Sequence, residues 1–124
     1  MACKNWLMKH FKIEEFDSPD MPGSGHNMDA QFLEKLDMLR EACGFPFKIN
    51  SGYRSKLHNA KVGGKSGSSH TKGLAVDIHC TESSKRCKIV QHALNMGITR
   101  IGIANTFVHL DVDNDKASNV IWTY

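Results

Sequence analysis

Two short segments constrain this chain most, because together they carry two histidines and one aspartate at a spacing that suits one bound ion. Residues 68–77 read SSHTKGLAVD, and residues 107–111 read FVHLD. Two imidazoles and one carboxylate form a three-ligand set that leaves a zinc ion one open position for water. A fold that suits this sequence must therefore bring His70, Asp77 and His109 together. Such a site is typical of a metallohydrolase.

The pattern around these residues predicts strands that can present them. Residues 74–78 alternate, with apolar side chains on one face and Ala75 and Asp77 on the other. Gly73 and Ala75 are small enough to permit a close approach of ligands from different elements. His109 and Asp111 are two apart, so a strand places them on the same face.

The rest of the chain predicts helices and short strands that alternate with turns. One helix begins at a cap at Asn27 or Asp29 and ends at Gly44, and another runs from Ser83 or Ser84 to Met96 and stops at Gly97. Strands are expected at residues 47–50, 74–78, 101–103, 107–112 and 120–124. Antiparallel strands with separated helices indicate an α+β fold, with a small antiparallel sheet flanked by helices.

Three segments fall outside this regular pattern. Residues 5–16 predict a short helix or turn. Residues 17–28 are a cluster of turn formers that predicts a loop able to overhang the site. Residues 55–69 are rich in Gly, Ser and Lys, and we expect them to form a loop over the site without regular structure.

Length and composition predict one soluble domain, residues 1–124. No apolar run approaches the roughly 20 residues of a membrane span, so we expect no membrane association. Lys9, His10 and Lys12 interrupt the N-terminal apolar residues, so we expect synthesis in the cytoplasm without a secretory signal. The net charge of +3 is mild and forms no basic run, so no nucleic-acid partner is expected. We expect a monomer.

The cysteines do not supply a second metal or redox site. Cys3, Cys43, Cys80 and Cys87 include no C-x-x-C pair, which argues against a zinc ribbon or a thioredoxin-like site. Cys43 is expected in the core. A bridge between Cys80 and Cys87 is conceivable from their proximity in the sequence, but the lack of an export signal disfavours it.

The order S-x-H-x-x-G-x-A-x-D, preceded by S-G-Y-R at residues 51–54 and followed by a strand bearing His109, resembles peptidase family M15. These are the zinc D-Ala-D-Ala carboxypeptidases of the hedgehog/DD-peptidase fold, and the resemblance runs from about Phe16 to the C-terminus. It implies that His70, Asp77 and His109 bind Zn²⁺ and that Arg54 holds the substrate's carbonyl or carboxylate and stabilises the oxyanion. The implied substrates are peptidoglycan stem peptides of the bacterial cell wall. The compact form is similar to small M15 peptidases of phages and bacteria.

The chain departs from the family pattern where a general base is needed. Many relatives carry an acid three positions before the last zinc histidine, but here that residue is Thr106, whose hydroxyl is not a base at neutral pH. Relatives of the lysostaphin type place a histidine two positions before the ligand, where this chain has Phe107. We therefore predict that Asp111, on the strand face of His109, is the general base, with Asp113 as the next candidate.

The predicted reaction is metal-assisted amide hydrolysis, in which zinc lowers the pKa of bound water towards roughly 7 and Arg54 offsets negative charge. The bond is left open: a terminal D-Ala, free D-Ala-D-Ala, an L-Ala-D-Glu bond or a crosslink. A ferrous oxygenase is disfavoured, because such sites commonly pair His-x-Asp with a later histidine and none follows His109.

A different class of function also fits, namely a binding or signalling module of the same fold that keeps zinc without catalysis. Thr106 keeps this alternative open. The five remaining histidines are interpreted as surface or hydrogen-bonded residues: His10, His26, His58, His79 and His92. Trp122 and Tyr124 are interpreted as residues that pack in the core or at the sheet edge.

Overall fold

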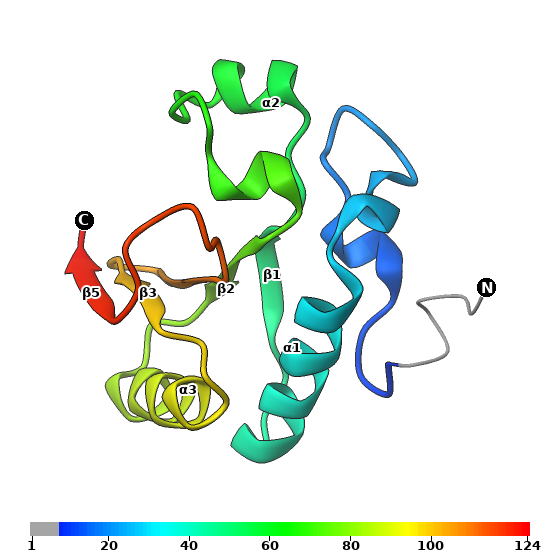
Figure 1. The fold of residues 1–124 in the computed structure, drawn as a ribbon. Coiled ribbons are helices and arrows are strands. Elements are labelled where there is room, and N and C mark those ends of the chain that lie inside the picture. Colours follow the sequence, from blue (N-terminus) through cyan, green and yellow to red (C-terminus); the bar gives the residue numbers. More distant parts are fainter. Residues whose placement is uncertain (1–7) are drawn as a thin grey trace.

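A five-stranded sheet organises the fold in the computed structural model, which describes residues 8–124 (Figure 1). The strands lie in the order β1-β2-β4-β3-β5. Their bounds are β1 Lys48–Ser51, β2 Ala75–His79, β3 Arg100–Ile103, β4 Phe107–Asp111 and β5 Val120–Thr123. The α+β class is confirmed. The sheet is mixed rather than wholly antiparallel, because residues 112–119 carry the chain back before β5, which pairs in parallel with β3.

The two longer helices, α1 (Ala30–Cys43) and α3 (Ser83–Asn95), lie where the sequence predicted them, although Glu82 precedes α3 without a side-chain capping hydrogen bond. Asp29 caps α1, because its side chain accepts a hydrogen bond from the Phe32 amide, and Gly44 ends the helix with a φ of 77°. A positive φ is costly for residues with a side chain, so glycine suits this end. In Figure 1 α1 and α3 lie together at one end of the molecule and the short helix α2 (Lys56–Lys61) lies at the other.

Helix α2 corrects the prediction that residues 55–69 lack regular structure. The Ser55 side chain accepts a hydrogen bond from the His58 amide and caps a helix that precedes the glycines of this segment. The first of them, Gly63, follows the helix with a φ of 76°. The composition of the whole window therefore hid a short helix at its start.

The remaining segments are mostly turns with short 3-10 helices. These are η2 (Ile13–Phe16), η3 (Ser24–Asn27) and η4 (Ser69–Lys72). Of the segment predicted as a helix or turn, residues 5–7 lie outside the described part of the chain. Cys43, Cys80 and Cys87 are free thiols, and Cys3 also lies outside the described residues. Within residues 8–124, no helix combines the length and the apolar character that crossing a membrane requires.

One face of the sheet packs on the helices and forms the core. Val76, Ile78, Val108, Leu110 and Ile101 are fully buried there. They share a cluster with apolar side chains of α1 and α3. Burying a side chain of this size stabilises the fold by about 1.5–3 kcal/mol. This packing fixes the sheet as a rigid base for its other face.

The opposite face of the sheet carries the polar residues, as strand alternation requires. Asp77 on β2 is the register partner of His109 on β4. On the other side of β4, Gly102 pairs with His109 and Arg100 pairs with Asp111. Neighbouring strands thus bring these side chains together.

Candidate metal centre

The three predicted ligands converge from η4, β2 and β4. His70 lies in η4, where the Ser68 side chain accepts a hydrogen bond from the His70 amide. Gly73 then turns the chain into β2 with a φ of 72°. A Cβ at Gly73 would lie 2.2 Å from the Asn27 carbonyl oxygen, so no larger residue fits here without movement of the backbone. This turn places His70 beside the Asp77–His109 pair.

One ligand atom from each of His70, Asp77 and His109 lies within 4.8 Å of the others, and all three side chains are buried. Asp77 Oδ1 lies 2.8 Å from His109 Nδ1 and 3.4 Å from His70 Nε2. The other nitrogen of His70, Nδ1, lies 2.8 Å from the Gly52 carbonyl oxygen. That contact orients the ring, so Nε2 faces Asp77. Two imidazole nitrogens and a carboxylate oxygen are a donor set that suits zinc and leaves a position open.

The site keeps Asp77 in the ionised form that ligates a metal. Burial opposes ionisation, but hydrogen bonds and charge from His109 and His70 outweigh it and hold the pKa of the Asp77 carboxyl below its usual range. For His109, burial lowers the pKa, but its contacts with Asp111 and Asp77 outweigh burial and raise it. The two carboxylates beside His109 thus favour positive charge at this place, whether it is a proton on the ring or a bound cation.

Arg54, the predicted substrate-binding residue, lies beside the candidate ligands. Its Nη2 is 3.6 Å from Asp77 Oδ2. Nε donates to Ser51 Oγ at 3.0 Å, and Nη1 donates to Asn59 Oδ1 at 3.3 Å. Asn59 is buried and also donates to the Lys65 carbonyl oxygen at 2.9 Å. Helix α2 therefore supplies a buried partner that holds Arg54, which the sequence alone did not predict.

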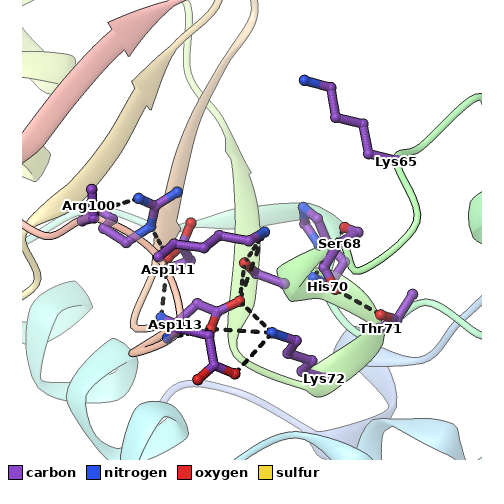
Figure 2. Close-up of polar contacts among 12 residues, drawn as sticks. Lys65, Ser68, His70, Thr71, Lys72, Arg100, Asp111 and Asp113 are labelled. Carbon is purple, nitrogen blue, oxygen red and sulfur yellow. Dashed lines mark hydrogen bonds and ion pairs between the residues drawn. The ribbon is translucent and has the colours of Figure 1, made fainter.

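Asp111, the predicted general base, contacts the opposite side of the His109 ring. Its Oδ2 lies 2.7 Å from His109 Nε2, whereas Asp77 faces Nδ1. Its Oδ1 lies 2.7 Å from Arg100 Nε and accepts a hydrogen bond from the Asp113 amide at 3.1 Å (Figure 2). The carboxylate therefore does not face the converging ligand atoms. Its predicted base role is untested.

Asp113, the second predicted base, is buried, and its carboxylate contacts polar groups of η4 and of the following turn. Its carboxylate accepts hydrogen bonds from Ser69 Oγ at 2.7 Å and from Lys72 Nζ at 3.1 Å (Figure 2). The Asp115 amide also donates to it at 3.1 Å. The Asp113 carboxylate is therefore engaged in hydrogen bonds with Ser69, Lys72 and the Asp115 amide.

Trp122 packs on the edge strand β5, as predicted, but its ring also contacts the site. It lies 5.4 Å from the His109 ring between centroids, and the Arg100 guanidinium lies 5.1 Å from its centroid on the ring face. Gly102 makes this possible, because a Cβ there would lie 2.6 Å from Trp122 Nε1 and 2.9 Å from Tyr124 Cε1. No local sequence signal identifies this contact, because the pairing of Gly102 with His109 depends on strand register.

The other histidines do not join the metal centre. Within residues 8–124, His70, Asp77 and His109 are the one group of His, Cys, Asp or Glu side chains that converges closely enough for an ion. The three ligands predicted from the sequence are therefore brought together, and Arg54 lies next to them.

Comparison with known proteins points to one family. A family model described as Peptidase M15 matches residues 9–111. The zinc D-Ala-D-Ala carboxypeptidase of Streptomyces albus G is similar to the chain, with 41% identity over 68 residues. That match covers 54% of this chain and 26% of the relative. The similarity thus spans about a quarter of the length of that curated relative.

Proposed function

The chain belongs to the peptidase M15 family, and from this membership we propose that it is a zinc-dependent peptidase that hydrolyses an amide bond in peptidoglycan stem peptides. The observation that carries the proposal is the convergence of His70 Nε2, Asp77 Oδ1 and His109 Nδ1 beside the Arg54 guanidinium. His70, Asp77 and His109 would hold a zinc ion, which would supply Lewis acidity and an activated water. The reaction class is amide hydrolysis.

Arg54 supplies the fixed positive charge that the reaction needs. Ser51 and Asn59 accept from Nε and Nη1, while Nη2 faces Asp77. We propose that Arg54 binds the carbonyl or the terminal carboxylate of the substrate. Its guanidinium offsets the negative charge that develops on the substrate oxygen. Because its partners hold the guanidinium in place, little reorganisation is required during the reaction.

The proposal extends to substrate and location. The similar Streptomyces protein is named a D-Ala-D-Ala carboxypeptidase, which supports a stem peptide as substrate. The bond is a terminal D-Ala-D-Ala bond, an L-Ala-D-Glu bond or a crosslink. We further propose that the chain acts on the bacterial cell wall as a monomeric peptidase domain over residues 1–124. A lytic enzyme encoded by a phage is one form that this function takes.

An alternative function has a specific observation in its favour. Thr106 replaces the family acid, and the two acids on the following strand and turn, Asp111 and Asp113, are bound to other partners. A zinc-containing module of this fold that binds peptidoglycan peptides without cleaving them would share these features. Turnover separates the two functions.

The test is cleavage by the zinc-loaded chain of a stem pentapeptide, free D-Ala-D-Ala, a crosslinked muropeptide and intact peptidoglycan, with products identified by mass spectrometry. His70→Ala is expected to lose roughly 10²-fold or more of the activity, because a ligand is removed. His79→Ala is the matched control, because this histidine is exposed on the same strand as Asp77. The mass of the product identifies the bond.

The outcomes separate the proposals. Cleavage by the wild type and His79→Ala, with little by His70→Ala, supports the peptidase. Peptide binding without cleavage of any substrate supports the binding module and contradicts the peptidase. Equal cleavage by His70→Ala and the wild type contradicts the assigned site.

A further inference from the structure

Both ring nitrogens of His109 contact carboxylates, and the two contacts have different consequences. Nδ1 lies 2.8 Å from Asp77 Oδ1, on the side where the ligand atoms converge. Nε2 lies 2.7 Å from Asp111 Oδ2, on the other side of the ring. A neutral imidazole carries its proton on one nitrogen and its lone pair on the other. Whatever fixes the proton on Nε2 therefore leaves Nδ1 free to act as a ligand.

The Asp111 carboxylate is held in one orientation by partners on its other oxygen. Arg100 Nε lies 2.7 Å from Oδ1, and the Asp113 amide donates to the same oxygen at 3.1 Å. The Asp111 side chain is 1% exposed. Arg100 is its register partner across β3 and β4, so the sheet itself positions the pair (Figure 2).

Arg100 is fixed in turn. Its Nη1 donates to the Ala117 carbonyl oxygen, and its guanidinium lies over the Trp122 ring. The same ring contacts His109. Asp111 and Trp122 therefore hold the His109 imidazole from two directions. A carboxylate held in this way can accept a hydrogen bond from Nε2–H of the ring, on the side opposite the Asp77 contact.

We propose that Asp111 is a positioning residue, held by Arg100, that accepts a hydrogen bond from Nε2–H of His109. This hydrogen bond keeps the Nδ1 lone pair directed at the metal. The zinc part of this inference rests on the proposed function. A carboxylate behind a ligating histidine fixes the tautomer and raises ligand basicity, and its loss typically weakens metal binding 10- to 100-fold. The role differs from that of a general base, which must reach the attacking water.

The geometry makes Asp111→Asn an informative substitution. Arg100 Nε–H and the Asp113 amide both require an acceptor at the position of Oδ1. The amide oxygen of asparagine satisfies them only if its NH₂ group faces His109 Nε2. A donor at that position favours the tautomer with the proton on Nδ1, which blocks the ligand atom. Asp111→Asn should therefore weaken zinc binding at least as much as Asp111→Ala.

The experiment measures zinc affinity by competition with a chelating dye for the full chain. Asp111→Asn and Asp111→Ala are compared with wild type and with the control variant Asp115→Asn. The Asp115 side chain lies nearby and is 84% exposed. We expect zinc affinity about 10- to 100-fold weaker for both Asp111 variants and unchanged for the control. Urea unfolding shows whether each variant is folded. A ¹⁵N NMR spectrum of the zinc-loaded wild type should show the proton on His109 Nε2.

Peptidase rates at saturating zinc complete the test. A positioning role predicts that much of the lost rate returns when zinc saturates Asp111→Ala. A general base predicts unchanged zinc affinity and a rate about 10²- to 10⁴-fold lower even at saturation, which would overturn the inference. A proton on Nδ1 in the spectrum would also overturn it. Weakened zinc binding with no peptidase activity in any form would support the inference and contradict the proposed function instead.

Discussion

Replacing Asp113 with asparagine should remove a stabilisation that depends on pH. Asp113 is 2% exposed and accepts hydrogen bonds from Ser69 Oγ, Lys72 Nζ and the Asp115 amide. Burial opposes its ionisation, but these hydrogen bonds and the Lys72 charge outweigh burial and lower the pKa of its carboxyl to about 2. The ionised form is therefore favoured more in the folded chain than in the unfolded chain.

The sign and size of the effect follow from linkage. A pKa of about 2 in the folded chain, against 3.8 for an unperturbed carboxyl, gives stability that is fully present above about pH 5. It is lost as the pH falls through the folded pKa. The whole shift corresponds to about 2 kcal/mol of unfolding free energy, of which about 1 kcal/mol is lost between about pH 6 and pH 3.

Urea unfolding of the zinc-free chain at these two pH values measures the effect. Asp113→Asn should be less stable than wild type at the higher pH, and this difference in unfolding free energy should shrink by about 1 kcal/mol at the lower pH. Asn114→Ala is the control, because it changes the exposed residue next to Asp113 without removing a titrating group. If the difference between Asp113→Asn and wild type is the same at both pH values, the carboxylate is not stabilised as the contacts require.

Two further predictions concern groups that support the site. Gly102→Ala should displace the Trp122 and Tyr124 rings, because the new Cβ would lie 2.6 Å and 2.9 Å from their atoms. It should cost about 1–3 kcal/mol in urea unfolding and change the tryptophan fluorescence, and an unchanged spectrum and stability would contradict this packing. Asn59→Ala should lower peptidase kcat/KM by roughly 10-fold with zinc affinity intact, because Arg54 loses a partner. Steady-state kinetics with a zinc titration checks this, and a variant that loses zinc but not rate would refute it.

Two of the three candidate metal ligands and the main helices were predictable because their signals are local. His70 and Asp77 lie in one short motif, and strand alternation placed Asp77 on the polar face. Asp29 and Gly44 marked the ends of α1 through capping chemistry that acts over a few residues. Helix α2 was missed for a local reason too, since the glycines downstream outweighed the cap at Ser55.

The surroundings of His109 were not predictable, because they depend on strand register. The strands predicted at residues 101–103 and 107–112 leave a loop at residues 104–106, which would pair residue 103 with residue 107. The observed register instead pairs Ile103 with Val108. A shift of one residue moves every side chain to the other face. The observed register places Arg100 opposite Asp111, the predicted base, so the contact between Arg100 Nε and Asp111 Oδ1 follows from the register. The parallel pairing of β5 with β3, which brings Trp122 to the site, is likewise set by non-local packing.

The most direct measurement is the zinc content of the purified chain after dialysis against zinc and then buffer, by mass spectrometry of the metal. About one zinc per wild-type chain is expected, with retention by His79→Ala and loss in His70→Ala and Asp77→Asn, because the latter two remove ligand atoms of the cluster. A wild-type chain that retains no zinc, or ligand variants that retain as much as wild type, would contradict a zinc site at His70, Asp77 and His109.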